Sequence, residues 1–207
     1  MPRMSREEKA RTHTRIVEVA AGMFRENGIA ATGVADVMKA AGLTHGGFYR
    51  HFASKDDLAA AAISHAVSTS LAELKEAEGL EAKTAALKRY IDRYLSDEHV
   101  GNPRDGCPLA ALGPGAPRSS PRISNALDEG SVEAVRILTA AMDGRREAAS
   151  SLMATLLGTV VMARMAGSHQ CRKRILLAGR RAALSIVKAG SGQDQAGGAR
   201  PKRTRRD

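Results

Sequence analysis

Cysteine and aromatic residues are scarce in this chain of 207 residues. The two cysteines, Cys107 and Cys171, are too few for a disulfide framework and form no C-x-x-C motif, so we expect a reducing, cytoplasmic environment. There is no tryptophan, and beyond residue 52 the only aromatic side chains are Tyr90 and Tyr94. A ligand pocket in that part of the chain would therefore be mostly aliphatic.

Long hydrophobic stretches are also absent. The longest uncharged run covers residues 148–163, which is 16 residues and includes Ser, Thr and Gly. A helix needs about 20 apolar residues to cross a bilayer, so we expect no membrane segment. The N-terminal residues are polar and do not resemble a cleavable signal, so we expect a soluble chain.

Motifs that catalysis requires are missing as well. The sequence has no Gly-rich phosphate loop. The best candidates for chemistry are Cys107 with His99 upstream of it, and His169 with Cys171 as a metal-binding pair. Neither pair has the number or spacing of groups that nucleophilic catalysis or a metal centre requires. We therefore predict that the chain is not an enzyme and holds no metal or cofactor.

Positive charge is in excess, and it is unevenly distributed along the chain. The net charge is +10; residues 1–55 hold 9 basic and 5 acidic residues, residues 56–163 hold 11 and 15, and residues 164–207 hold 12 and 2. A basic N-terminal part followed by an acidic middle indicates that the N-terminal part contacts a polyanion, whereas the middle does not.

The most informative stretch covers residues 34–58. Val37 and Met38 belong to a short apolar pattern with helical spacing, Gly42 suits the left-handed backbone that ends a helix, and Thr44 is a good N-cap for a second helix. The pattern therefore predicts two short helices joined by a tight turn.

The second of these helices, expected at residues 45–51, is too short and too glycine-rich to be stable by itself. Phe48 and Phe52 lie four residues apart and would hold one of its faces against neighbouring helices. The other positions are small, polar or basic and are free to face a partner: His45, Gly46, Gly47, Tyr49, Arg50 and His51. This pattern is typical of a helix-turn-helix, whose second helix enters a major groove of DNA.

The stretch resembles the TetR family of bacterial transcription regulators, whose pattern reads T-x-x-x-x-I-A-x-x-A-G-[VL]-[ST]-x-G-x-[LF]-Y-x-H-F-x-[SN]-K-x-x-L. The matching residues are Thr32, Ala41 to Thr44, Gly47 to Tyr49, His51, Phe52, Ser54, Lys55 and Leu58. Val37 and Met38 stand where Ile and Ala are usual, and Gly33 stands where a hydroxyl residue is common. The motif covers the first quarter of the chain, and the remainder agrees in helical pattern and length.

The resemblance implies DNA contacts for particular residues. The DNA backbone would be held by Thr44, Tyr49, Lys55 and His51, while His45, Gly46, Gly47 and Arg50 would face the base edges. Thr32 and Gly33, at the start of the first helix of the motif, complete the predicted DNA-binding set. The two glycines of the reading helix permit close approach, so that thymine methyls or DNA shape would supply part of the specificity.

The rest of the pattern predicts an all-α chain. We expect helices at about residues 5–27, 54–78, 81–97, 124–142, 146–166 and 168–189, and an irregular Gly/Pro-rich segment at 101–121 with one short helix at 107–112. The expected domains are a helix-turn-helix DNA-binding domain at 1–53, a larger helical ligand-binding and dimerisation domain at 54–190, and a disordered basic tail at 191–207.

The resemblance also implies a small-molecule effector in the larger domain. We expect its pocket under the Gly/Pro-rich segment, lined by His65, Tyr90, Tyr94 and Cys107, although His65 is also consistent with a simple packing role. Cys107 begins a short helix, where a thiolate is favoured, and could sense oxidants or electrophiles there. The alternative for Cys107 is a small, buried apolar residue.

The last two expected helices carry stripes of small and apolar residues. The stripes consist of Leu156, Thr159 and Ala163 on one helix and of Ile175, Ala178, Gly179, Ala182 and Ile186 on the other. These helices either pack within their own domain or, as the resemblance implies, meet a second copy of the chain in a four-helix dimer interface.

The sequence thus favours a ligand-responsive repressor that binds a palindromic operator in double-stranded DNA as a homodimer and is released by a small-molecule effector. Two alternatives stay open. One is a redox- or electrophile-sensing regulator that uses Cys107. The other is a sequence-neutral DNA-binding protein, which would explain the basic tail but not the long acidic helical middle.

Overall fold

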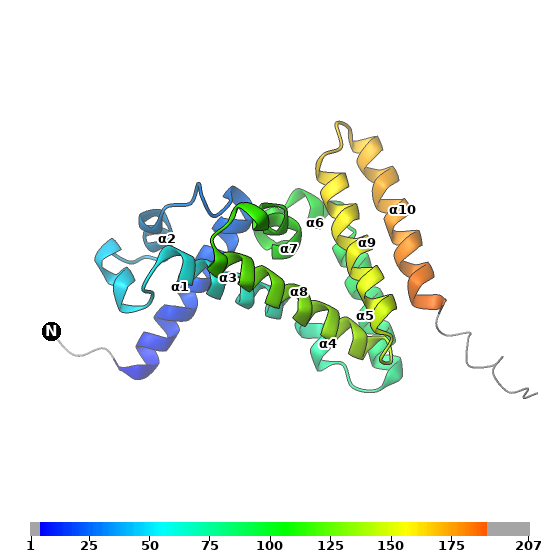
Figure 1. Cartoon of the computed structure of the whole chain (residues 1–207), viewed down its shortest axis with the longest axis horizontal. Coiled ribbons are helices and arrows are strands. Elements are labelled where there is room, and N and C mark those ends of the chain that lie inside the picture. The colour runs from blue at the N-terminus through cyan, green and yellow to red at the C-terminus, as the bar shows by residue number, and fades with distance from the viewer. Residues whose placement is uncertain (1–4, 190–207) are drawn as a thin grey trace, which may run out of the picture.

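The computed structural model describes residues 5–189, and the regular elements of this part are all helical, as predicted (Figure 1). In chain order they are α1 (Arg6–Asn27), α2 (Val34–Ala40), the 3-10 helix η1 (His45–Arg50), α3 (Lys55–Ser70), α4 (Ala72–Glu76), α5 (Leu80–Tyr94), α6 (Asp97–Gly101), η2 (Pro103–Asp105), α7 (Pro108–Leu112), η3 (Gly113–Arg118), α8 (Pro121–Ala141), α9 (Arg146–Arg164) and α10 (His169–Lys188).

The N-terminal elements and the last two helices lie at opposite ends of an elongated molecule (Figure 1). α2 and η1 form one end, together with α1, while α9 and α10 pack side by side at the other. α3 and α8 pack against each other between the two ends, and α1 also packs on α3. The two ends are thus joined by helices that are in direct contact.

Helix α1 begins and ends where the sequence predicts. The Ser5 hydroxyl accepts a hydrogen bond from the Glu8 N–H at 3.1 Å, and the Glu8 carboxylate accepts one from the Ser5 N–H at 2.8 Å, which completes a capping box. The helix ends at Gly28, whose φ of 84° is unfavourable for other residues. Ile16 and Phe24 lie on its buried side, so α1 supports the elements that follow it.

The predicted helix-turn-helix is present, with one difference. Gly42 has a φ of 71° in the turn after α2, and Phe48 and Phe52 are both buried, as expected. The second element is a 3-10 helix rather than an α-helix, because it is only six residues long and contains two consecutive glycines. Thr44 occupies its N-cap position, but the Thr44 hydroxyl makes no capping hydrogen bond.

Two of the predicted long helices are divided. The helix expected at 54–78 breaks at the buried Leu71, which separates α3 from α4. The helix expected at 81–97 ends at Tyr94, because Ser96 starts the new helix α6 by accepting a hydrogen bond from the His99 N–H at 3.1 Å.

The Gly/Pro-rich segment was predicted to hold one short helix at 107–112 and to be irregular elsewhere. The short helix is confirmed as α7, but the irregular remainder is wrong, because it folds into η2 and η3; all three elements have a proline in their first positions, where the missing N–H costs nothing. α7 is further fixed by the buried Leu109 and Ala110. α8 begins at Pro121, three residues earlier than expected, with Ser120 as its N-cap.

Two further predictions concern the ends of the chain and membranes. The predicted tail at 191–207 lies outside the described residues. Between residues 5 and 189, no helix is long and apolar enough to cross a bilayer.

Candidate nucleic-acid interface and effector cavity

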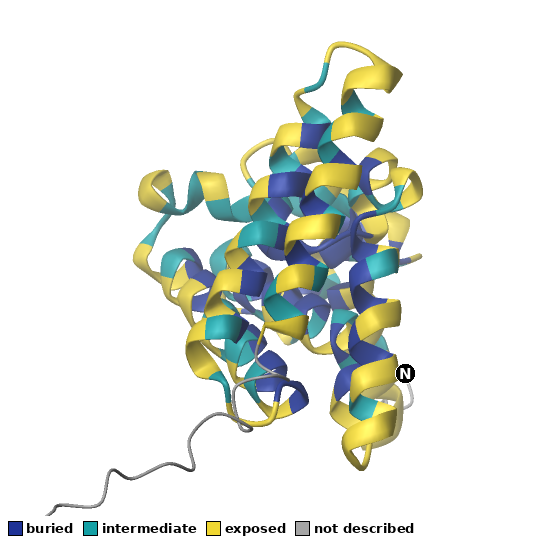
Figure 2. Ribbon diagram, turned by 90° about the vertical axis from the view of Figure 1, so that its right-hand side faces the viewer, coloured by how far each residue is buried: buried dark blue, intermediate teal, exposed yellow. Residues whose placement is uncertain are grey.

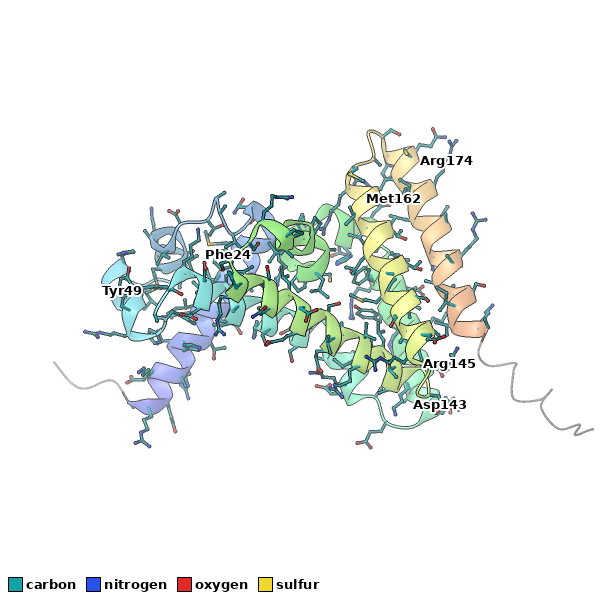
Figure 3. The ribbon with its side chains drawn as sticks, viewed as in Figure 1. Phe24, Tyr49, Asp143, Arg145, Met162 and Arg174 are labelled. Carbon is teal, nitrogen blue, oxygen red and sulfur yellow. The ribbon has the colours of Figure 1, made fainter. Side chains whose placement is uncertain are left out.

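The element η1 has one buried and one exposed side. Phe48 is only 1% exposed and stacks on Phe52 with ring centroids 5.8 Å apart, which anchors η1 to the N-terminal core. Tyr49 is 71% exposed, and Figure 3 shows it at the end of the molecule, pointing away from the body. His45 and Arg50 are exposed beside it. Of the polar side chains predicted to contact DNA, His45, Tyr49 and Arg50 thus share an open surface.

The start of α3 adds a cation next to this surface. Ser54 caps α3 by accepting a hydrogen bond from the Asp57 N–H at 3.1 Å. Lys55 is half-buried, and its ammonium group donates to the Ala30 carbonyl at 3.2 Å, in the segment that leads into α2. Lys55 therefore joins the starts of the two helices, and its position there is compatible with a phosphate contact.

Thr32 does not belong to the DNA-facing set. Its side chain is 3% exposed, and its hydroxyl donates to the Gly28 carbonyl at 2.8 Å. A buried hydroxyl that closes the turn after α1 cannot also bind a phosphate, so the predicted role of Thr32 is wrong. Gly33, the N-cap of α2, is half-buried, and its predicted DNA contact stays a prediction.

His51 is enclosed more than we expected. It is half-buried, its Nδ1 atom is buried without a hydrogen-bond partner, and its ring lies 5.9 Å from that of His13. Burial lowers the pKa of His51, and the nearby His13, Lys9 and Arg50 lower it further. His51 is thus neutral near pH 7 and packs between α1 and η1, which leaves its predicted backbone contact as a prediction.

A cavity of about 750 Å³ lies between α1, α3, α5 and the segment from α6 to Cys107. This volume is in the range of sites that hold drug-sized ligands. The four residues predicted to line an effector pocket, His65, Tyr90, Tyr94 and Cys107, all lie in its wall. The expected aliphatic lining is wrong, because the other wall residues are small or polar, among them Ala21, Arg25, Thr69, Ser70, Glu73, Arg93, Ser96, Glu98, His99, Asn102 and Asp105.

The innermost wall is made by two tyrosines, a histidine and the cysteine. Tyr90 and Tyr94 are 3% and 4% exposed, with ring centroids 5.5 Å apart. His99 Nε2 accepts a hydrogen bond from the Cys107 N–H at 2.9 Å, and His99 Nδ1 lies 2.6 Å from the Tyr94 carbonyl oxygen. These two partners define the neutral tautomer that carries its proton on Nδ1.

Of the two possibilities for Cys107, the structure supports the buried residue rather than the thiolate, and sensing by this cysteine stays a prediction. Cys107 is 4% exposed, and burial raises the pKa of its thiol, so the neutral form is favoured. The N-terminus of α7 does not reverse this, because that helix has only five residues. The thiol is therefore a buried member of the cavity wall, which agrees with the alternative of a small buried residue.

The sequence pattern gave no indication of two arginines close to this wall. Arg25 is half-buried in the last turn of α1, and Arg164 is half-buried at the end of α9. Within the described residues, neither guanidinium has a carboxylate at salt-bridge distance. A basic residue in the last turn of a helix usually reflects a solvated helix end, so only the folded structure shows where these two lie.

The cavity wall is also attached to the N-terminal domain. Arg25 Nε donates to the Arg104 carbonyl at 2.7 Å, and the Arg104 guanidinium donates to the Glu26 carboxylate at 2.8 Å. Gly22 lies against the Arg104 side chain, since a Cβ at this position would be 3.2 Å from Arg104 Cγ. α1 is thus at once a wall of the cavity and the support of the helix-turn-helix.

The second pair considered for chemistry, His169 and Cys171, lies at the start of α10. His169 Nε2 lies 3.7 Å from an Asp97 carboxylate oxygen, and Cys171 is exposed in the first turn of α10. Across residues 5–189, no group of three or more His, Cys, Asp or Glu residues could hold a metal ion.

The predicted dimer stripe divides into an inner and an outer part. Leu156, Thr159, Ala163 and Gly179 are buried where α9 packs on α10 of the same chain, so their predicted contact with a second copy is wrong. Ala178 and Ala182 are exposed, while Ile175 and Ile186 are half-buried. The inner positions are buried because the small residues on both helices allow α9 and α10 of one chain to pack closely.

An exposed apolar stripe remains on the outer face of the same two helices. Met162, Met165 and Leu177 are 54%, 72% and 60% exposed. Figure 2, which looks onto this end of the molecule, shows exposed residues along the outer sides of its helices. The stripe consists of Ala154, Gly158 and Met162 on α9, of Met165 directly after it, and of Leu177, Ala178 and Ala182 on α10.

Residues 16–62 match the family of bacterial regulatory proteins described as the tetR family. An uncharacterised HTH-type transcriptional regulator of Mycobacterium tuberculosis is 35% identical over 100 residues, which is 47% of this chain and 50% of that protein. The HTH-type transcriptional regulator TtgR of Pseudomonas putida is 36% identical over 80 residues, 38% of each chain. The chain thus spans half or less of the length of these relatives.

The likeness to solved structures extends over most of the chain. The crystal structure of a TetR-family transcriptional regulator from Cytophaga hutchinsonii has a TM-score of 0.68 and covers 91% of this chain and 98% of its own, at 20% identity. At this identity the likeness concerns the fold: an N-terminal helix-turn-helix followed by a larger helical domain.

Proposed function

Because the chain belongs to the tetR family of bacterial regulatory proteins, we propose that it is a DNA-binding transcriptional regulator that responds to a small molecule. In the form we favour, it is a repressor that binds a palindromic operator as a homodimer and is released when an effector occupies the cavity. The N-terminal domain, at residues 1–53, would read the DNA, and residues 54–190 would bind the effector and the second copy.

The surface of η1 is the observation that carries this proposal. Phe48 holds the element in place while Tyr49, His45 and Arg50 remain exposed on its outer side. A guanidinium can donate two hydrogen bonds to a guanine, and a phenol can donate to a phosphate. The glycines Gly46 and Gly47 leave room for the backbone of η1 to approach the floor of the groove.

The shared helix α1 supports a response to a ligand. Ala21 and Arg25 belong to the cavity wall, and the same helix carries Ile16 and Phe24 into the core beneath the helix-turn-helix. A ligand that contacts the wall can therefore favour one position of α1 over another. Such a ligand changes the affinity for DNA only to the extent that it binds more tightly to one position of α1 than to the other.

The exposed stripe of α9 and α10 supports a homodimer. Each η1 covers one half-site, so that two copies related by a two-fold axis would read a palindrome with half-sites roughly one DNA turn, ~34–36 Å, apart. Ala182→Glu places a charge in this stripe and should yield a monomer with weak operator binding. A variant that still sizes as a dimer would mean that the interface lies elsewhere.

Selection of bound fragments from random DNA, followed by footprinting, tests the proposed function as a whole. We expect the full chain to enrich one inverted repeat and to protect a defined window around it. A uniform pattern without a protected window would instead identify a sequence-neutral DNA-binding protein.

A further inference from the structure

The end of η1 meets the first half of α1 through a cluster of rings. His13, on α1, stacks on Phe52 with ring centroids 4.5 Å apart, and its ring lies 5.9 Å from that of His51, the C-cap residue of η1. Both histidines are half-buried, whereas Lys9, about one helical turn before His13, is exposed. The first half of α1 and η1 lie at the same end of the molecule (Figure 1). The rings therefore bring side chains of α1 to the edge of the η1 surface.

The titratable groups that face His51 are all basic. They are His13 and Lys9 from α1 and Arg50 from η1, and no carboxylate of the described residues is among them. The carboxylate of Glu8, the neighbour of Lys9, is engaged in the capping box at the start of α1. Basic groups that gather without a counter-ion repel one another when charged, so an anion placed among them would be stabilised. We refer to Lys9, His13, Arg50 and His51 as the junction cluster.

The two ring nitrogens of His51 lie in different surroundings. Nδ1 is buried without a hydrogen-bond partner. Nε2 makes no hydrogen bond within the described residues and is not among their buried polar atoms that lack a partner, which leaves Nε2 as the atom that can reach a ligand. On protonation both nitrogens carry a proton, and Nε2 becomes a charged donor for an anion.

The charge of His51 depends on whether an anion is present. In the free chain, burial and then the neighbouring His13, Lys9 and Arg50 lower the pKa of His51, so the ring is neutral near pH 7. A phosphate beside the ring would act in the opposite sense, because a nearby negative charge favours the protonated imidazole. An anion that binds at the junction cluster would therefore bind together with a proton.

We propose that the junction cluster binds a phosphate of the DNA backbone, held by Lys9 of α1 and by His51, which takes up a proton from solvent when the DNA binds. His13 positions the His51 ring by packing between it and Phe52. Since the complex favours the protonated ring, operator affinity is high at low pH and falls as the pH rises through the pKa of His51 in the complex. This assignment rests on the DNA-binding role proposed above and adds to it a contact from α1 and a dependence on pH.

The test measures binding of the full chain to a duplex that contains the selected operator, between about pH 6 and pH 8. Each proton taken up strengthens binding by up to about tenfold for every pH unit by which the pH is lowered. Calorimetry in two buffers of different ionisation enthalpy counts the protons directly, and we expect an uptake of up to about one proton per chain near pH 7.

The variants separate the members of the junction cluster. His51→Gln should remove most of the proton uptake and flatten the pH dependence, whereas His13→Phe, which keeps a ring on Phe52, should retain most of the uptake. Lys9→Gln should weaken binding to all sequences alike and lower the salt slope by ~1. The matched controls are His169→Gln and Lys88→Gln, at exposed positions of α10 and α5, which should bind like the parent chain.

Three results would overturn the assignment: an operator affinity that is the same across this pH range, a proton uptake that is lost in His13→Phe or His45→Gln but kept in His51→Gln, or a Lys9→Gln chain that binds like the parent. Lys9 is exposed, so Lys9→Gln should unfold at the same temperature as the parent, and its weaker binding would not reflect misfolding. Failure to select any operator at any pH would contradict the proposed function itself. An operator that is selected and then bound independently of pH would contradict the junction cluster alone.

Discussion

The surface of η1 and the cavity beside α1 use polar residues in opposite ways. On η1 the polar side chains are exposed, and Tyr49 reaches into solvent with 71% of its surface accessible. In the cavity the two tyrosines are buried, and Tyr94 has 4% of its surface accessible, while the rim carries exposed groups such as Glu18 and Glu98. An exposed surface with basic side chains suits a long polyanion, whereas a cavity with a buried aromatic wall suits a small ligand.

The difference also concerns what holds each region in place. The η1 surface depends on two buried rings, Phe48 and Phe52, below a short 3-10 helix. The cavity is surrounded by several long helices and by the short elements α4, α6 and η2. Substitutions should therefore affect stability and binding in different proportions in the two regions.

Phe48→Ala should have the largest effect. Truncation of a fully buried phenylalanine costs about 3–5 kcal/mol, and η1 has little other support. We expect a lower free energy of unfolding in denaturant titration and loss of DNA binding. The neighbouring Tyr49→Ala is the control, since an exposed side chain should change stability by about 0.5 kcal/mol or less. Equal losses for the two variants would contradict the assignment of buried and exposed sides.

Gly179→Ala should have the next largest effect on stability. A Cβ at this position would overlap the Thr159 side chain on α9, and overpacking of this kind costs about 1–3 kcal/mol. Gly46→Ala in η1 is the matched control, because a Cβ at this position meets open space. Gly46→Ala should leave thermal unfolding unchanged and weaken DNA binding. A destabilised Gly46→Ala would show that η1 is packed more tightly than its exposed side indicates.

The tyrosine pair provides the most direct contrast. Tyr49→Phe should leave the free energy of unfolding unchanged and weaken DNA binding, because its hydroxyl would contact a phosphate. Tyr94→Phe should leave DNA binding by the ligand-free chain unchanged and should not lower stability, since it removes a buried hydroxyl that lacks a strong partner. A loss of more than about 1 kcal/mol in Tyr94→Phe would mean that Cys107 bonds this hydroxyl well.

The histidines should produce a smaller, pH-dependent effect. Burial lowers the pKa of His99. The hydrogen bond to Tyr94 raises this pKa in part, whereas the charges of Arg164 and Arg93 lower it further. Burial also lowers the pKa of His51. The unfolded chain therefore binds protons more readily than the folded one. The stabilisation of the fold by these neutral histidines is complete above the ordinary histidine pKa of about 6.5, and it is lost as the pH falls below that value.

We expect the melting temperature to fall between pH 7 and pH 5, and His99→Gln to show a shallower fall than the parent chain. His65→Gln is the control, because His65 is only half-buried and makes neither of the two ring hydrogen bonds seen in His99. A pH dependence that His99→Gln leaves unaltered would contradict the buried neutral state of His99.

The DNA-facing region could be predicted from the sequence in some detail because its signals are local. The capping box at Ser5, the turn at Gly42 and the spacing of Phe48 and Phe52 each act over a few residues. The same local reasoning assigned Thr32 to the DNA surface. It failed there because the hydroxyl is used to close the turn at Gly28, which no spacing rule indicates.

The cavity could be predicted only in part because its wall comes from distant segments. The two tyrosines stood out as the only aromatic residues beyond residue 52, but Arg25 and Arg164 carry no sequence signal, since they become neighbours of Cys107 only in the folded chain. The dimer stripe was misassigned for a related reason. Small residues permit close packing of helices, but they do not indicate whether the partner helix belongs to the same chain or to another.

Affinity for the selected operator and its single-base variants, compared between the parent chain, Arg50→Ala and Arg136→Ala, tests the central assignment most directly. Arg50→Ala should lose about 1–3 kcal/mol of binding and relax the preference at one position in each half-site, while Arg136→Ala should bind like the parent. If Arg50→Ala weakened binding to every single-base variant of the operator equally, Arg50 would be a contact to the DNA backbone. An Arg50→Ala protein that binds as tightly and as selectively as the parent would contradict the assignment of η1 as the reading element.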